Sequence, residues 1–155
     1  MSNLSNKKSK EKPVRPGCVH EVVQDCIWLG DIHSCSSEVI NKCDITHVIC
    51  IIDKPNYPHK CSEEKIETLV LCFKDLPDVD ISEYMRKSFD FIDKALIDGG
   101  RVLVHCKAGV SRSASVCINW VMKSFDMTYG EAFKLIQKSR KQIAPNEGFI
   151  KQLSE

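Results

Sequence analysis

The chain has 155 residues and a net charge of +1, with 43% hydrophobic and 28% charged residues. This composition is typical of one soluble domain that buries its own core, and it excludes a multidomain assembly. No run approaches the roughly 18 uninterrupted apolar residues of a membrane-spanning helix, and no secretory signal is recognisable. The near-balanced charge gives no reason to expect nucleic acid as a partner. We therefore expect a cytoplasmic protein without a membrane span.

The first 16 residues differ from the rest of the chain. They are rich in lysine and serine, contain Pro13 and Pro16, and carry five basic side chains against a single acidic one, Glu11. Such a segment has too little apolar surface to join a core. We predict a disordered basic leader over residues 1–16 and a folded domain over residues 17–155. The lysine cluster leaves a nuclear location open as well.

Short apolar runs rich in β-branched residues predict strands in the first half of the domain. In chain order, the predicted elements are strands at Val19–Val23 and Cys26–Leu29, a helix at Ser36–Lys42, and strands at His47–Ile52 and Glu67–Phe73.

Helical periodicity dominates the second half. Apolar residues at intervals of four, three and four predict an amphipathic helix that starts near Ser82 and ends at the glycine pair 99–100. The elements that follow are a strand at Arg101–His105, a buried helix at Ser113–Phe125, a helix from the capping residue Thr128 to about Arg140, and a last helix from Asn146 to Leu153. Strands that alternate with helices predict an α/β domain whose mixed, mainly parallel sheet is covered by helices on both faces.

One segment carries the candidate chemistry. A polar loop from Cys106 to Arg112 joins the strand that ends at His105 to the helix that begins at Ser113. A ligand at such a junction meets free backbone N–H groups and the positive end of the helix dipole, which together bind anions. Gly109 lets the loop curl closely around the ligand, and the planar guanidinium of Arg112 can hold two phosphate oxygens. The pattern predicts a phosphate site.

The donors that bind phosphate also act on Cys106. Helix amino termini and neighbouring cations stabilise the thiolate form of a cysteine, which is the nucleophilic form. We expect Cys106 to attack phosphorus and to form a cysteinyl-phosphate intermediate that water then hydrolyses. The common nucleotide-binding loop is excluded, because the chain contains no Gly-x-x-x-x-Gly-Lys-Ser/Thr sequence.

The run His105-Cys106-Lys107-Ala108-Gly109-Val110-Ser111-Arg112-Ser113 resembles the Cys-x5-Arg motif of cysteine-dependent protein phosphatases, in its dual-specificity form. Segments Cys26–Gly30, Ile45–Ile49 and Pro145–Phe149 extend the resemblance to about residues 18–153. It implies a compact catalytic domain of the small, atypical kind, with a central sheet of about five strands flanked by helices. It also implies phosphoprotein substrates, with hydrolysis of phosphotyrosine and phosphoserine or phosphothreonine that needs no metal or other cofactor.

Members of this family use a general acid on a loop that precedes the cysteine. Asp75 lies 31 residues before Cys106, directly after a predicted strand and in an Asp-x-Pro context that resembles this loop. A serine or tyrosine oxygen leaves poorly unless it is protonated, and the same carboxylate can later take the proton from water. Asp78 and Asp80 lie on the same stretch and remain alternatives.

The resemblance also assigns roles to the other residues of the motif. Ser113 matches the hydroxyl that aids departure of the cysteine thiolate, although at a helix start it could equally be a cap. His105 is expected to support the loop electrostatically. Asn146 is expected to cap the last helix, with bracing of the loop as a further role. The residues expected to bind phosphate together with Arg112 are Lys107, Ala108, Gly109, Val110 and Ser111.

Two other functions stay open. Lys107-Ala108-Gly109 resembles the loop of phosphoinositide and other phospholipid phosphatases of the same superfamily, whereas Val110 stands where those enzymes tend to have a second basic residue. A non-catalytic phosphate-binding module would most simply lack the cysteine, and Cys106 is present. The sequence does not indicate an oligomeric state.

Oxidation is a further expectation from the chemistry. A thiolate in an open cleft is prone to sulfenic acid formation, and a second cysteine nearby can resolve it as a disulfide. The candidates for such a partner are Cys50 and Cys72.

Overall fold

The computed structural model describes residues 13–55 and 65–155. Residues 1–12, most of the predicted leader, lie outside the described residues, and so does most of the segment between the third and fourth strands. Within the described part of the leader, Arg15 donates a hydrogen bond from Nη1 to Nε2 of His33 at 3.0 Å.

A five-stranded mixed sheet forms the centre of the fold, with the order β1-β2-β5-β3-β4. Strands β2, β5, β3 and β4 run parallel, while β1 pairs antiparallel with β2 at one edge. The prediction of a mixed, mainly parallel sheet of about five strands is therefore confirmed. The strands are β1 Val19–Val23, β2 Ile27–Gly30, β3 His47–Ile52, β4 Glu67–Cys72 and β5 Val102–His105.

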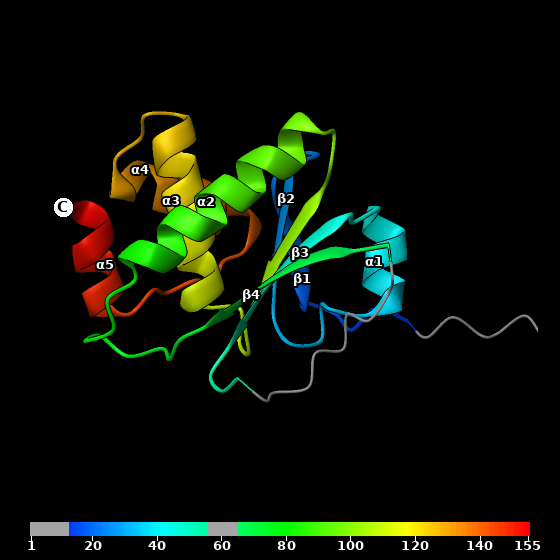
Figure 1. The fold of residues 1–155 in the computed structure, drawn as a ribbon, viewed down its shortest axis with the longest axis horizontal. Coiled ribbons are helices and arrows are strands. Elements are labelled where there is room, and N and C mark those ends of the chain that lie inside the picture. Colours follow the sequence, from blue (N-terminus) through cyan, green and yellow to red (C-terminus); the bar gives the residue numbers. More distant parts are fainter. Residues whose placement is uncertain (1–12, 56–64) are drawn as a thin grey trace, which may run out of the picture.

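Helices cover both faces of the sheet, as predicted. Figure 1 shows α1 on one face and the other four helices on the opposite face. The helices are α1 Ser37–Cys43, α2 Ser82–Ile97, α3 Arg112–Ser124, α4 Tyr129–Ser139 and α5 Glu147–Ser154. The capping box predicted for α4 is present, since Thr128 Oγ1 accepts from Glu131 N and Glu131 Oε2 accepts from Thr128 N, both at 3.2 Å.

The core is divided by the sheet into two layers, because successive side chains of a strand point to opposite faces. The strand residues buried on the side of α2–α5 include Ile27, Leu29, Ile49, Ile51, Val102 and Val104. Those buried on the side of α1 include Trp28, Val48, Cys50, Ile52 and Leu103. Helix α3 is buried from Arg112 to Val121. Each large aliphatic side chain that becomes fully buried contributes roughly 1.5–3 kcal/mol, so α3 is firmly anchored under the loop that precedes it.

Several boundaries differ from the prediction by one residue, and the starts of β2 and α3 are two examples. Strand β2 begins at Ile27 and not at Cys26, because Asp25 has a φ of 59° and Cys26 N donates to Val23 O at 3.0 Å, which closes a turn. Helix α3 begins at Arg112 and not at Ser113, so that the arginine of the motif is the first helical residue.

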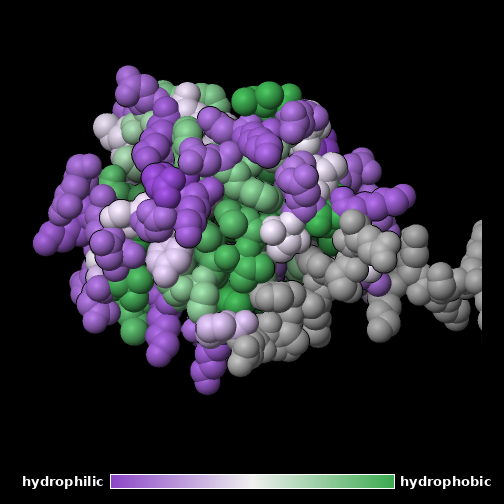
Figure 2. All heavy atoms as spheres, viewed as in Figure 1, coloured by the Kyte–Doolittle hydropathy of each residue, from purple (hydrophilic) through white to green (hydrophobic). Residues whose placement is uncertain are grey.

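The face of the molecule shown in Figure 2 is mostly polar, with an apolar area near its centre where α2 approaches β4. On the outer strand β4, Val70 is 39% exposed. Among the helices of the described residues, none is long and apolar enough to cross a membrane.

Candidate active site

The candidate site lies at the carboxyl edge of the parallel strands. Strands β5, β3 and β4 end at this edge and are followed by Cys106, Asp53 and Asp75, respectively, within a few residues. Open α/β sheets bind their ligands outside the carboxyl ends of the strands, where side chains from separate segments converge. The fold therefore brings the predicted nucleophile and the predicted acid to the same edge.

Cys106 lies buried at the base of the loop formed by residues 106–111. Its Sγ lies 3.0 Å from Ser113 Oγ, and the backbone N–H of Gly109 donates to the sulfur at 3.3 Å. Gly109 has a φ of 66°, a conformation that glycine adopts without steric cost. At the start of α3, Ser111 occupies the N-cap position without a side-chain cap hydrogen bond. The N–H donor and the helix start favour negative charge at this position.

Ser113 is the second residue of α3 and therefore does not cap the helix. The structure instead places its hydroxyl against Cys106 Sγ. Of the two roles that the sequence left open, this position fits a contact with the sulfur and not a helix cap.

Arg112 is held at one of its nitrogens. Its Nη1 donates to Oδ1 of Asp53 and, at 3.2 Å, to the carbonyl oxygen of Phe73. Within the described residues the guanidinium makes no other hydrogen bond, which leaves Nε and Nη2 as a two-pronged donor for a phosphate. Asp53 was not predicted as a site residue, and its place directly after a buried strand was the only signal that could have found it.

Asp75 contacts the loop directly. Its Oδ1 accepts hydrogen bonds from Ser111 Oγ at 2.7 Å and from Asn146 Nδ2 at 2.8 Å. The alternative Asp80 is engaged elsewhere, because Ser82 donates to it from its N–H and its hydroxyl, and these bonds lower the pKa of Asp80. Asp75, Asp78 and Asp80 are all exposed, and Asp75 is distinguished by its hydrogen bonds to Ser111 of the phosphate loop and to Asn146.

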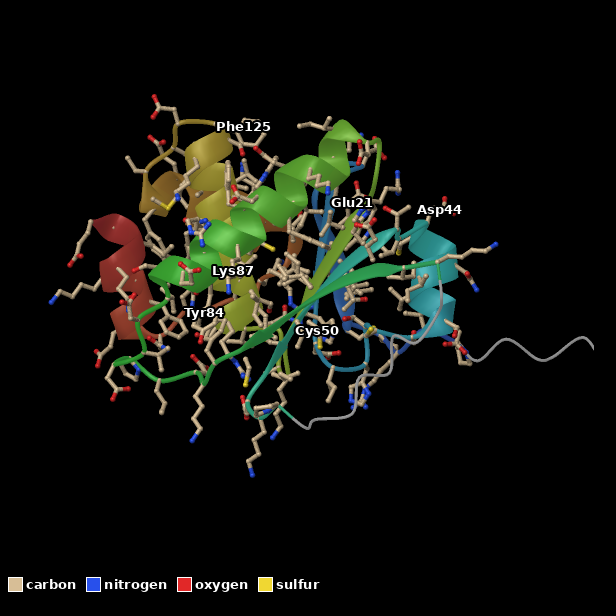
Figure 3. All side chains as sticks on the ribbon, viewed as in Figure 1. Glu21, Asp44, Cys50, Tyr84, Lys87 and Phe125 are labelled. Atoms are coloured by element: carbon tan, nitrogen blue, oxygen red, sulfur yellow. The ribbon has the colours of Figure 1, made fainter. Side chains whose placement is uncertain are left out.

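Tyr84 fixes the end of the strand that leads to Asp75. Figure 3 labels it near the start of α2, from which its hydroxyl donates to Cys72 O at 3.1 Å. Its ring stacks on Phe73 with a centroid separation of 4.5 Å. This contact positions the two residues that precede the acid loop.

Asn146 has both of the roles considered for it. Its Oδ1 accepts from Phe149 N at 2.9 Å, which caps α5. Its own N–H donates to Ser111 Oγ at 3.0 Å, and its amide donates to Asp75. The residue thus links the start of α5 to both the phosphate loop and the acid loop.

The remaining predicted residues surround Cys106. His105 is buried at the end of β5, in register with Cys50 of β3. Lys107 and Ala108 are exposed, while Val110 O accepts from Ala144 N at 2.8 Å. The carbonyl of Lys107 accepts from Ile32 N at 3.1 Å. The loop is therefore braced on two sides by backbone hydrogen bonds.

The two candidate resolving cysteines differ in their placement. Cys50, labelled in Figure 3, is buried within the sheet, and this burial, with a further contribution from Cys106, raises the pKa of its thiol to about 11. Cys72 is partly buried at the end of β4 and packs on the α1 side of the sheet. The contribution of Cys106 to this shift indicates that Cys50 lies near it, while the raised pKa disfavours the thiolate that would resolve a sulfenic acid. Disulfide formation with Cys106 stays a prediction.

Arg140 is a site residue that the sequence did not reveal. It follows α4, is 1% exposed, and donates from Nε to Gly109 O at 2.8 Å. The sequence marked it only as the end of a helix. For metal ions, no group of three or more His, Cys, Asp or Glu side chains within residues 13–55 and 65–155 is suitably arranged.

Comparison with known proteins identifies close relatives in sequence. Residues 27–155 match the family model described as the dual specificity phosphatase catalytic domain. Serine/threonine/tyrosine-interacting protein B of Xenopus laevis is 41% identical over 124 residues, 76% of this chain and 53% of that protein. A probable dual specificity protein phosphatase of Dictyostelium discoideum is 37% identical over 128 residues, 83% of this chain and 32% of that protein. The chain thus spans about half, or less, of these two relatives.

Solved structures share the fold. The human tyrosine phosphatase-like serine/threonine/tyrosine-interacting protein superposes with a TM-score of 0.81 at 36% identity, covering 87% of this chain and 92% of that one. Human DUSP28 gives a TM-score of 0.79 at 25% identity, covering 92% and 93%. PTPMT1 in complex with PI(5)P gives 0.77 at 22% identity over 88% and 92%, a likeness of fold alone.

Proposed function

Because the chain belongs to the dual-specificity phosphatase family, we propose that it is an active, metal-independent phosphatase of phosphoproteins. Its substrates are phosphotyrosine and phosphoserine or phosphothreonine, and the reaction passes through a cysteinyl-phosphate intermediate. One observation carries the proposal: Cys106 Sγ lies against both Ser113 Oγ and the Gly109 N–H, next to an arginine with two unoccupied donor nitrogens among the described contacts.

The first step transfers the phosphoryl group to the enzyme. The Cys106 thiolate attacks phosphorus, a sulfur–phosphorus bond forms, and the bond from phosphorus to the substrate oxygen breaks. Protonated Asp75 gives its proton to the leaving oxygen and becomes a carboxylate. The backbone N–H groups of the loop and Nε and Nη2 of Arg112 stabilise the charge on the other phosphate oxygens.

The second step regenerates the enzyme. Ionised Asp75 takes a proton from water, whose oxygen attacks phosphorus while the sulfur–phosphorus bond breaks. The hydroxyl of Ser113 donates to the departing sulfur, which leaves as the thiolate. The product is inorganic phosphate, and both Cys106 and Asp75 return to their initial states.

A phosphate-binding module without turnover is the second candidate. The names of the relatives support it, since one is an interacting protein and the solved human structure is described as phosphatase-like. Against it stands the complete set of Cys106, Arg112 and Asp75. Phospholipid substrates receive less support, because the neighbour in complex with PI(5)P is only 22% identical and Val110 adds no charge to the loop.

The decisive experiment measures hydrolysis of p-nitrophenyl phosphate, phosphopeptides and phosphoinositides in excess chelator. We expect turnover of the aryl phosphate and of phosphopeptides, and Cys106→Ser protein from the same preparation controls for contaminating phosphatases. Binding of phosphopeptides without turnover would favour the phosphate-binding module. Preferential hydrolysis of phosphoinositides would favour the lipid phosphatase. Activity that disappears with EDTA and returns with a metal would contradict the proposed mechanism.

Physiological substrates can be found with a slowed enzyme. Asp75→Ala removes the acid that protonates the leaving oxygen, so that bound phosphoproteins remain on the enzyme long enough to be captured from a cell extract. Capture that competes with free phosphate identifies ligands of the site itself.

A further inference from the structure

A buried arginine lies behind the phosphate loop, outside the motif. Arg140 has the largest of the fully buried side chains, and each nitrogen of its guanidinium donates at least one hydrogen bond. The acceptors are Gly109 O for Nε at 2.8 Å, Gly17 O and His20 Nδ1 for Nη1 at 3.0 and 2.8 Å, and Ala108 O for Nη2 at 3.5 Å. A buried cation is costly unless its donors are satisfied, and here backbone carbonyls of the loop satisfy two of its three nitrogens.

The peptide geometry links these bonds to the nucleophile. The C=O and N–H of a trans peptide point in opposite directions, and the described chain has no cis peptide. Ala108 O and Gly109 N belong to one peptide unit: the oxygen accepts from Arg140, and the N–H donates to Cys106 Sγ. Gly109 O likewise faces Arg140, so the N–H of Val110 points away from Arg140.

We propose that Arg140 is a positioning residue: by binding two consecutive carbonyl oxygens it turns the N–H groups of the phosphate loop toward Cys106 and the bound phosphate. This inference rests on the proposed function, because it concerns the same site. Arg140 itself touches neither the sulfur nor the substrate in this role. It orients the groups that do.

Packing behind the loop agrees with this role. A Cβ atom added to Gly109 would lie 2.6 Å from Arg140 Nη2 and 2.7 Å from Gly30 O, so that the loop backbone and the guanidinium are in close contact. Such contact leaves the two carbonyls no room to rotate without displacing Arg140. The glycine is thus required for the approach of Arg140 as well as for its positive φ.

Arg140 also connects the loop to the start of the domain. Gly17 and His20 precede residues 27–155, the part that matches the family model. A guanidinium has donors only, so Nδ1 of His20 must accept. Burial lowers the pKa of Arg140, whereas Asp31 and the thiols of Cys106, Cys18 and Cys117 oppose this effect. The segment before β2 thereby contributes to the shape of the site.

The test compares Arg140→Gln and Arg140→Lys with a matched control, Arg101→Gln. Arg101 is less deeply buried than Arg140 but likewise donates to a carbonyl, Cys43 O at 2.9 Å, and it lies at the opposite edge of the sheet. Two quantities are measured: the alkylation rate of Cys106 by iodoacetamide at pH 6.5, resolved by peptide mass spectrometry, and the protection of Cys106 by vanadate. The midpoint of urea unfolding is recorded for each variant.

We expect Arg140→Gln to slow alkylation of Cys106 and to weaken vanadate protection, each by roughly tenfold, because an oriented donor to the thiolate is lost. Arg140→Lys keeps the charge but lacks the planar fork whose separate nitrogens reach the two carbonyls, so vanadate protection should weaken almost as much. If Arg140→Gln does not fold, His20→Ala tests the same role, because it removes one hydrogen-bond acceptor of Arg140. We then expect alkylation and vanadate protection of Cys106 to weaken by roughly two- to threefold.

The inference is overturned if Arg140→Gln lowers the urea midpoint as Arg101→Gln does but leaves alkylation and vanadate protection of Cys106 unchanged. Neither readout needs turnover. A wild-type protein that binds vanadate but hydrolyses nothing would therefore contradict the proposed function and leave the role of Arg140 to be judged by the variants.

Discussion

The two sides of the phosphate loop are built in different ways. On the side that faces the ligand, Cys106, Arg112 and Ser113 belong to one short run of the sequence, and a strand, a loop and a helix that are adjacent in the chain position them. On the rear side, the contacts come from Arg140 after α4, from Gly17 and His20 around the start of β1, and from the turn after β2. The reacting groups are thus encoded locally, whereas the shape of the loop depends on long-range packing.

This difference predicts different consequences of substitution. A change on the ligand side removes a reacting group and leaves the loop as it was. A change on the rear side leaves every reacting group present but allows the loop carbonyls to turn, which weakens several donors at once. The variants below separate these two outcomes, in order of decreasing expected effect.

The largest effect is expected for Cys106→Ser. The serine hydroxyl is a far weaker nucleophile than the thiolate, so kcat for p-nitrophenyl phosphate should fall by several orders of magnitude. Phosphate binding should persist, because Arg112 and the loop N–H groups remain. Equilibrium binding of phosphate, measured by calorimetry, checks this separation, and loss of binding together with turnover would show that the ligand side is not independent of the loop's shape.

Asp75→Asn should have the next largest effect. For a poor leaving group such as phosphoserine, we expect kcat to fall by roughly 10²–10⁴-fold, the usual contribution of a positioned acid, and the basic limb of the pH–rate profile to flatten. An activated aryl phosphate should be affected less, because its departing oxygen needs less protonation.

Asp80→Asn is the matched control for the acid. It lies on the same stretch but bonds Ser82, so both the basic limb and the dependence on the leaving group should remain. If Asp80→Asn or Asp78→Asn reproduces the loss and Asp75→Asn does not, the mechanism holds with another acid.

Much of this architecture could be predicted from the sequence, because it is governed by local patterns. Short apolar runs, helical periodicity and capping residues located the five strands and five helices, and the capping pair Thr128 and Glu131 was correct in detail. The segment that holds Asp75 was recognisable through its resemblance to the acid loop of the family, 31 residues before Cys106. Asp53 and Arg140 escaped prediction, since a carboxylate after a strand and an arginine after a helix acquire meaning only when the sheet order and the packing of α4 are known.

Asp53→Ala should have a moderate effect. Asp53 binds Nη1 of Arg112, opposite the nitrogens that are left for phosphate, so its loss should let the guanidinium turn and raise the dissociation constant of phosphate by roughly three- to tenfold. Titration of the Cys106→Ser protein with phosphate measures this without turnover. Tighter binding would instead mean that the carboxylate competes with phosphate for Arg112.

The smallest effect concerns the pH dependence of stability through His20, at the far end of the Arg140 contacts. Burial lowers the pKa of His20, and the neighbouring Arg140 lowers it further, so that the folded state releases the proton more readily than the unfolded chain. In the unfolded chain, a histidine has a pKa of about 6.5. Below that pH the unfolded state therefore binds more protons than the folded state. The stability that is present above about pH 6.5 is lost as the pH falls through the pKa of His20 in the folded state.

His20→Gln removes the titrating group, while the side-chain oxygen of the glutamine can still accept a hydrogen bond from Arg140. The free energy of unfolding of this variant, measured in urea between pH 7.5 and pH 5, should decline less than that of the wild type, by a fraction of a kcal/mol. His33→Gln is the matched control, because His33 also bonds an arginine but lies exposed. An unchanged slope in His20→Gln, or an equal change in His33→Gln, would contradict the assignment of this pH dependence to the rear side of the loop.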